Sequence, residues 1–314
     1  MKRIVLSFLL ILVISQIKAQ PLAQRLDSLL SNDPMLRTSE VGITVFDLTT
    51  GESLFQYQDE KLYRPASTEK VVTSVTALAT LGLDYTMDTR LQYTGKIEGD
   101  TLKGNLYLVG GFDPEFMDED LDSLVDVIAQ SGIRYIADTL AADVSMMDSV
   151  YWGNGWSWDD VPDSFQPYMS PLMLNRGCVD VTVIPAEKDS LPIIECVPAS
   201  DYYQVDNDGV SNNPQAGNLR ITRNWLHNGN QIHVTGNVSK KTTRTLSIYT
   251  SKDFFFHTFI NRLKEKGIEA NTTAFADCPE NDSLRVVSPL FTLQRPIGEV
   301  LTQMMKESDN LCAE

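Results

Sequence analysis

The segment "RPASTEKVV", residues 64–72, places Ser67 three positions before Lys70. Residues three apart on a helix are neighbours on one face, so this hydroxyl and amine lie close enough for direct proton transfer. The positive end of the helix dipole and burial in a cleft both disfavour the ammonium form of a first-turn lysine. The pair therefore has the residue types of a nucleophile and its general base. Backbone N–H groups at the same helix start would begin an oxyanion hole.

A simpler explanation of this tetrapeptide is that Ser67 caps a helix while Lys70 extends into solvent. The same spacing also occurs by chance at Ser15 and Lys18. The first motif is weak evidence by itself.

A second motif, Ser308-Asp309-Asn310, stands near the end of the sequence. A helix is predicted to begin at Pro296, and Ser308 lies four residues beyond the apolar Met304, on the same face if the helix continues that far. A similar tripeptide at 211–213 falls in the polar segment 204–218, which is predicted to be a long loop.

The surrounding pattern predicts the elements that must position these residues. Residues 21–31 are predicted to form a helix, 41–58 two strands joined by a turn, and 67–82 a helix that Gly82 terminates. From about 88 to 284 short strands alternate with turns, and two further helices are expected at about 120–131 and 252–266.

The two motifs, in this order and each beside a helix, resemble the set found in penicillin-recognising serine enzymes. Soluble β-lactamases keep the two motifs far closer than the 241 positions between Ser67 and Ser308. The gap resembles that of the D-alanyl-D-alanine carboxypeptidase/endopeptidase family (peptidase family S13, the penicillin-binding protein 4 type). The resemblance covers essentially the whole mature chain. Other stretches that resemble this family are "TLGLDYTMDTRL" (80–91), "LKGNLYLVGGFDP" (102–114), "GWSWDD" (155–160), "SPLMLNRG" (170–177) and "ESDNLCAE" (307–314).

The resemblance implies an α/β (α+β) fold in which a transpeptidase/β-lactamase-like domain is interrupted by a large, mostly β insert. The interrupted domain is expected at 20–88 and 285–314, and the insert at 89–284, with one domain nested in another.

The family's chemistry implies a role for each motif residue. Ser67 would attack a carbonyl carbon to form an acyl-enzyme, and Lys70 would take its proton. Ser308 would relay a proton to the leaving amine, and Asn310 would hold the substrate amide. The implied substrates are peptidoglycan stem peptides ending in D-Ala-D-Ala or their cross-links, and β-lactams would acylate Ser67. Carboxypeptidase and endopeptidase activity stay open, because both cleave beside a D-alanine carbonyl with the same residues.

By the same resemblance, Asp160 is expected to contact the amino group of the stem's diamino acid, with Asp159 as the alternative. The segments around it have plainer explanations. Trp156 and Trp158 are expected in the core, and "GGFDP" at 110–114 is expected to form a structural turn.

The family's third motif, Lys-Thr-Gly, is missing after Ser308. Lys241-Thr242-Thr243 lacks the glycine and precedes the second motif. The sequence therefore predicts a C-terminally incomplete copy with weak or no activity. The alternatives are a non-catalytic peptidoglycan-binding protein with a vestigial serine and, less favoured, a β-lactamase-like hydrolase.

Residues 1–19 have the pattern of a signal peptide, with Lys2 and Arg3 before an apolar run too short to span a bilayer as a mature helix. Its removal leaves 23 Lys and Arg against 42 Asp and Glu, a charge of −19. Such a chain is a poor partner for nucleic acid, which requires clustered cations. No membrane segment is expected in the mature chain. The expected location is the periplasm of a Gram-negative bacterium.

Neither the four cysteines nor the three histidines have the spacing of a metal site, so no metal or cofactor is expected. An exported protein can form disulfides. Cys178 and Cys196 are the predicted pair; the remaining cysteines are Cys278 and Cys312.

Overall fold

The computed structural model describes residues 21–280 and 286–314. These residues form two compact units that divide after Ala66. The predicted signal peptide, 1–19, lies outside the described residues. The predicted discontinuous domain, 20–88 with 285–314, stays a prediction.

The first unit contains two helices and a two-stranded antiparallel sheet, as predicted for its helix and strand pair. In chain order its elements are α2 (Leu22–Asn32), α3 (Pro34–Thr38), β1 (Ile43–Asp47) and β2 (Glu52–Tyr57). The Asp47 side chain accepts a hydrogen bond from the backbone N–H of Thr49 at 2.8 Å, which closes the turn between the strands.

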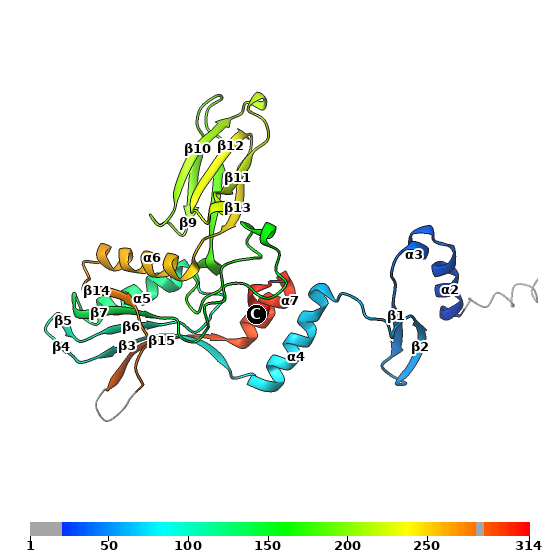
Figure 1. Ribbon diagram of the computed structural model, residues 1–314, viewed down its shortest axis with the longest axis horizontal. Coiled ribbons are helices and arrows are strands. Elements are labelled where there is room, and N and C mark those ends of the chain that lie inside the picture. Colours follow the sequence, from blue (N-terminus) through cyan, green and yellow to red (C-terminus); the bar gives the residue numbers. More distant parts are fainter. Residues whose placement is uncertain (1–20, 281–285) are drawn as a thin grey trace, which may run out of the picture. The chain divides into compact units, whose positions relative to one another are not determined.

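The second unit is built around a seven-stranded mixed sheet with two helices on one face (Figure 1). Its path is β15-β3-β6-β7-β5-β4, and β14 pairs with β7. Helices α5 and α6 confirm the two predicted helices and supply buried leucines and phenylalanines to the main core. The bounds are β3 (Thr86–Thr94), β4 (Lys96–Glu98), β5 (Thr101–Lys103), β6 (Leu106–Val109), α5 (Asp118–Gln130), β7 (Tyr135–Asp143), α6 (Ser251–Glu265), β14 (Glu269–Phe275) and β15 (Val287–Pro296).

Two three-stranded sheets form a smaller β region, which Figure 1 draws on the side of α6 away from the large sheet. One has the order β13-β8-β9 and the other β10-β12-β11. In β8, Val179, Val181 and Val183 are fully buried while the residues between them are half-buried, the alternation expected of a strand with one face in a core. The bounds are β8 (Cys178–Ile184), β9 (Ile193–Val197), β10 (Gln204–Ser211), β11 (Arg220–Arg223), β12 (Gln231–Val238) and β13 (Thr242–Ser247).

Strand β10 corrects the prediction that 204–218 is a loop. Its sequence "QVDNDGVS" is polar, but it pairs in parallel with β12 over its whole length. Ladder hydrogen bonds and exposure of the polar side chains on one face outweigh the low strand propensity of Asn, Asp and Gly. Only the second part of the segment, after Ser211, is irregular or in a short 3₁₀ turn.

The predicted disulfide between Cys178 and Cys196 is wrong, because all four cysteines are free. The antiparallel register of β8 and β9 sets Cys196 opposite Val181. Cys178 is instead aligned with Ser247 on the other side, in β13.

The pairing of β3 with β15 brings together the two helices that adjoin the motifs. Helix α4 (Glu69–Leu81) precedes β3, and β15 leads into α7 (Ile297–Glu307). The two strands pair antiparallel, and the Ile297 N–H donates to the Tyr85 carbonyl at 3.0 Å where they end. The starts of β3 and α7 are therefore joined, although some two hundred residues separate them in sequence.

The predicted structural turn in "GGFDP" is confirmed only at its end: the Asp113 carbonyl accepts from the Phe116 N–H at 3.4 Å, while residues 110–112 are irregular. A Cβ at Gly110 would lie 2.5 Å from the carbonyl oxygen of Pro171, and one at Gly111 would overlap the Asp88 carbonyl. The backbone approaches its neighbours too closely for any side chain here. Asp113, at the end of this segment, is buried.

Asp113 ties this turn to the end of β15. Its carboxylate is fully buried and lies 3.2 Å from Nε of Arg295, whose Nη2 lies 2.9 Å from Asp120 at the start of α5. Burial raises the pKa of Asp113 to about 6, although Arg295 acts in the opposite direction.

A pH-dependent stability should follow from Asp113. Its folded pKa of about 6 exceeds the ordinary value of 3.8, so the folded state binds more protons between these pH values. Stability from this group is full below pH 3.8 and is lost as the pH rises through about 6. The loss corresponds to about 3 kcal/mol. We expect the unfolding free energy of the wild type, relative to Asp113→Asn, to fall between pH 4 and 7 in urea titrations. A relative stability that rises with pH would mean that Arg295 controls the carboxylate instead.

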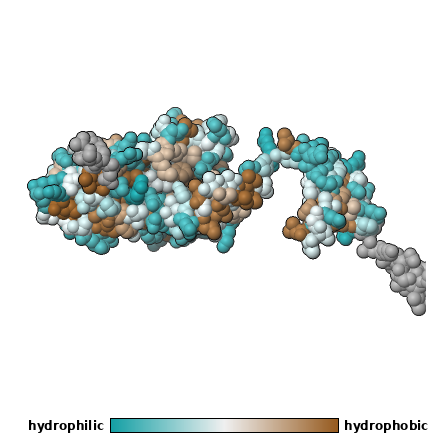
Figure 2. Space-filling view, turned by 90° about the horizontal axis from the view of Figure 1, so that it is seen from below, coloured by the Kyte–Doolittle hydropathy of each residue, from teal (hydrophilic) through white to brown (hydrophobic). Residues whose placement is uncertain are grey.

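Helix α4 leaves much of its apolar surface exposed, and Figure 2 shows hydrophobic side chains gathered over it. Exposed apolar residues of the helix and the turn after it are Val71, Val72, Val75, Leu78, Leu81 and Leu83. Across residues 21–280 and 286–314, no helix has the length and apolar character needed to cross a bilayer.

Candidate active site

Ser67 lies in a single 3₁₀ turn, Ala66–Thr68, directly before α4. The helix proper begins at Glu69 with Thr68 at the N-cap position, so the expectation that Ser67 caps it is wrong. Ala66 has a φ of +46°, a left-handed conformation that is strained for a residue other than glycine. The Ser67 residue is exposed, which leaves its hydroxyl accessible.

Lys70 lies in the first turn of α4 and is only 7% exposed. Its Nζ lies 3.2 Å from Ser67 Oγ and 2.7 Å from Asn310 Oδ1, and donates to both. Within the described ranges, no carboxylate forms an ion pair with it. The lysine therefore joins the two motifs through uncharged oxygens.

Ser308 follows the last residue of α7 and has a left-handed φ of +57°. Helix α7 does not continue through the motif, so the turn, and not the helix face, directs this side chain. The Ser308 hydroxyl donates to Ser67 Oγ at 2.7 Å, and Asn310 Nδ2 donates to the Phe165 carbonyl at 3.4 Å. The structure thus brings all four predicted motif residues together, with Ser67 Oγ between an amine and a hydroxyl.

The middle residue of the second motif, Asp309, is held by a charged network that the sequence did not reveal. Arg176 binds Glu115 through two guanidinium nitrogens at 2.8–3.1 Å, and its Nε lies 3.7 Å from Asp309. Burial lowers the pKa of Arg176, but the hydrogen bond to Glu115 together with the charges of Glu115 and Asp309 more than offsets it, so the pKa is raised overall. The only sequence signal was the "SPLMLNRG" stretch, for which no role was predicted.

Glu115, Asp309 and Cys312 form a group whose ligand atoms lie within 4.8 Å of one another. Arg176 already contacts both carboxylates. Burial, with these carboxylates beside it, raises the pKa of the Cys312 thiol well above its ordinary value. A cationic side chain and a protonated thiol make this group a structural anchor for the motif.

A cavity of about 580 Å³ borders the second motif. Four carboxylates line it besides Asp309: Asp118, Glu119, Asp180 and Glu307. Asp160 is absent from this lining; it is half-buried in the 3₁₀ turn Trp158–Asp160. Its predicted contact with substrate, and that of Asp159, stay predictions.

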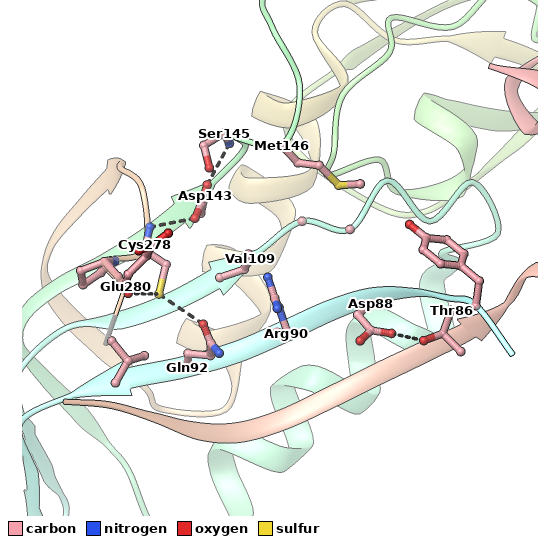
Figure 3. A pocket seen from close by; sticks show the side chains of 15 residues that line it. Thr86, Asp88, Arg90, Gln92, Val109, Asp143, Ser145, Met146, Cys278 and Glu280 are labelled. Atoms are coloured by element: carbon pink, nitrogen blue, oxygen red, sulfur yellow. Dashed lines mark hydrogen bonds between the residues drawn. The ribbon is translucent and has the colours of Figure 1, made fainter. Parts of the chain in front are cut away.

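A second cavity, about 560 Å³, lies on the sheet face opposite α5 and α6 and contains none of the four motif residues. Figure 3 shows the Asp143 carboxylate turned to the backbone N–H groups of Ser145 and Cys278, while Arg90 extends from β3 between Gln92 and Asp88. This cavity is separate from the proposed chemistry.

Comparison with known proteins gives the chain a consistent set of relatives. The model of the D-Ala-D-Ala carboxypeptidase 3 (S13) family matches residues 22–314. The D-alanyl-D-alanine carboxypeptidase of Actinomadura sp. (strain R39) is 27% identical over 304 residues, which cover 93% of this chain and 56% of that protein.

Solved structures agree. The crystal structure of penicillin binding protein 4 (dacB) from Haemophilus influenzae is 25% identical with a TM-score of 0.69, over 86% of this chain and 60% of that one. A second structure of that protein, complexed with a novel β-lactam, has a TM-score of 0.63 at 23% identity, over 86% and 58% of the two chains. These matches confirm the predicted fold class. The chain spans just over half the length of these relatives.

Proposed function

This chain belongs to the D-Ala-D-Ala carboxypeptidase 3 (S13) family, and we propose that it acts as a penicillin-binding serine peptidase of the cell wall. The observation that carries the proposal is the hydrogen-bonded cluster in which Ser67 Oγ contacts both Lys70 Nζ and Ser308 Oγ. A hydroxyl in contact with both a basic group and a proton relay is the arrangement that nucleophilic acyl transfer needs.

In the proposed reaction, Ser67 Oγ forms a bond to the carbonyl carbon of the penultimate D-alanine. Its proton passes to unprotonated Lys70 Nζ, and the C–N bond to the leaving residue breaks. The leaving nitrogen receives a proton through Ser308, whose hydroxyl is 2.7 Å from Ser67 Oγ. Water then hydrolyses the acyl ester and regenerates the serine.

Asn310 has two roles in this proposal. Its Oδ1 accepts from Lys70 at 2.7 Å and so fixes the lysine, while Nδ2 lies 3.4 Å from its own partner, the Phe165 carbonyl. That long hydrogen bond is weak, so a substrate amide oxygen can replace it as acceptor.

The proposed substrates are peptidoglycan stem peptides that end in D-Ala-D-Ala, or the cross-links between stems. The relatives' printed names, which describe D-alanyl-D-alanine carboxypeptidases, support this choice. The H. influenzae protein complexed with a β-lactam supports acylation of Ser67 by the same class of compound. Such substrates place the protein outside the cytoplasm, and we propose the periplasm.

Labelling with fluorescent penicillin tests this proposal on the complete gene product. We expect one covalent adduct, located by peptide mass mapping to the tryptic peptide that contains Ser67. Heat-denatured protein should carry none. The enzyme hypothesis would be abandoned if the native protein stayed unlabelled, or if the adduct mapped elsewhere.

A further inference from the structure

Trp158 is exposed, which corrects the expectation that it lies in the core. Its side chain is 64% exposed, whereas Trp156 is half-buried against Met169, Met173 and Leu311. Most of the aromatic surface of Trp158 therefore stays in contact with water, and a ligand that covered it would gain the free energy of burying that surface.

Trp158 is paired with a second tryptophan from a different part of the chain. Its ring centroid lies 5.5 Å from that of Trp225, with 34° between the ring planes. Trp225 begins the short turn between β11 and β12, and the next residue, Leu226, is 67% exposed. Two segments that are distant in sequence thus form one exposed aromatic surface. Apolar residues that gather on a surface in this way are more typical of a binding site than single exposed ones are.

A polar sheet face adjoins the aromatic pair. In the register of β11 and β12, Arg220 is opposite Thr235 and Thr222 is opposite His233, so these four side chains share one face. Their neighbours in the strands face the other side and are buried. The surface beside Trp225 therefore offers hydroxyl, imidazole and guanidinium groups.

These residues line a pocket of about 280 Å³. Its lining is Arg220, Thr222, Arg223, Asn224, Trp225, Leu226, His233 and Thr235. It contains no carboxylate, in a chain that has 42 Asp and Glu residues. Beside the lining, the Asp206 carboxylate lies 3.1 Å from Nδ1 of His233 and compensates any positive charge there. The pocket is thus suited to a neutral ligand with many hydroxyl or amide groups.

The turn that carries Trp225 is held rigidly. Arg223 is 1% exposed, and it donates to the Ser247 carbonyl at 2.6 Å and to the Gly229 carbonyl at 3.0 Å. The Tyr168 hydroxyl donates to Asn228 Oδ1 at 3.3 Å. A surface held in place by its supports loses little entropy when a ligand binds.

We propose that Trp158, Trp225 and the polar face of β11 and β12 bind sugar rings of a glycan strand. A pyranose ring has an apolar C–H face, which suits the electron-rich face of an indole, and a rim of hydroxyls and amides, which suits the polar groups. The segment with Trp158 continues to Phe165, whose carbonyl accepts from Asn310. The choice of a peptidoglycan glycan rests on the proposed function, and the site would hold the strand whose peptides reach Ser67.

Binding of peptide-free glycan strands to the complete protein tests this site without using catalysis. Strands released from sacculi by an amidase are titrated by calorimetry, and tryptophan fluorescence gives a second readout. We expect Trp225→Ala and Trp158→Ala each to weaken binding about tenfold, equivalent to about 1.4 kcal/mol. Trp225→Phe, which keeps an aromatic face, should stay within about threefold of the wild type.

Leu191→Ala is the matched control, since Leu191 is a 63% exposed apolar residue outside the pocket. It should bind strands as the wild type does, and all variants should keep their penicillin labelling. The glycan site is overturned if both alanine variants bind normally, or if only peptide-bearing fragments bind. The two assays are independent for the wild-type protein. A wild-type protein that is labelled by penicillin but binds no strands rejects this site alone. A wild-type protein that binds strands but is not labelled rejects only the proposed catalysis.

Discussion

Replacing Lys70 with alanine should slow penicillin acylation by about 10³-fold, the range expected when a general base is removed. The physical reason is that Lys70 Nζ is the basic group within 3.2 Å of Ser67 Oγ, and the hydroxyl is a poor nucleophile unless its proton is removed. The measurement is the second-order acylation rate from the time course of fluorescent labelling.

Lys70→Arg separates the base from a simple positive charge. A guanidinium retains the charge but cannot be deprotonated in a protein, so this variant should be as slow as the alanine variant. Lys306→Ala, an exposed lysine in the last turn of α7, is the matched control and should react at the wild-type rate. An arginine variant that kept most of the rate would show that Lys70 acts only through its charge.

Arg176→Ala should lower the acylation rate roughly 100-fold, although Arg176 does not touch Ser67. Removing the guanidinium leaves the carboxylates of Glu115 and Asp309 facing each other across the space it filled. Their repulsion should displace the turn that carries Ser308 and Asn310, so that the hydrogen bonds to Ser67 and Lys70 lengthen. We expect the rate constant for acylation to fall much more than the affinity of the initial complex.

Two further variants show whether Arg176 positions the motif or only stabilises the fold. Arg262→Ala removes another partly buried arginine, which pairs with Asp118 and Asp122, so it should lower stability without this loss of rate. Asp309→Asn keeps an oxygen for the Cys312 N–H but weakens the charge contact, and its effect should be smaller. Equal rate losses in the Arg262 and Arg176 variants would contradict a positioning role.

Ser67 and Lys70 could be predicted because their chemistry depends on local spacing. Ser67 and Lys70 are three positions apart, and any helix start brings such a pair together. Asn310 and Ser308 required the family resemblance, since nothing in the local pattern shows which residues 240 positions away will meet Lys70. The pattern did predict the helix between Gly82 and the first motif, because capping and periodicity are also local.

Predictions failed where long-range packing decides the outcome. The polar segment that forms β10 lacks the alternating pattern of a strand, and it becomes a strand only because it pairs with β12. The disulfide between Cys178 and Cys196 is predicted only from the oxidising compartment. The compartment does not reveal the strand register, which keeps the two cysteines apart. Trp158 is expected in the core, yet its position depends on a partner ring far away in the sequence.

The pairing of β3 with β15 sets the order in which the protein can fold. Thr94 is opposite Val287, so the chain between β3 and β15 is a loop whose two ends must meet before these strands can pair. Closing so long an unfolded loop costs entropy, but a folded intervening segment would already hold the ends together. Ser67 and Ser308 should therefore meet late, after the intervening segment has become compact. Folding of that segment is then a requirement for assembling the surroundings of the nucleophile, even though it supplies neither serine.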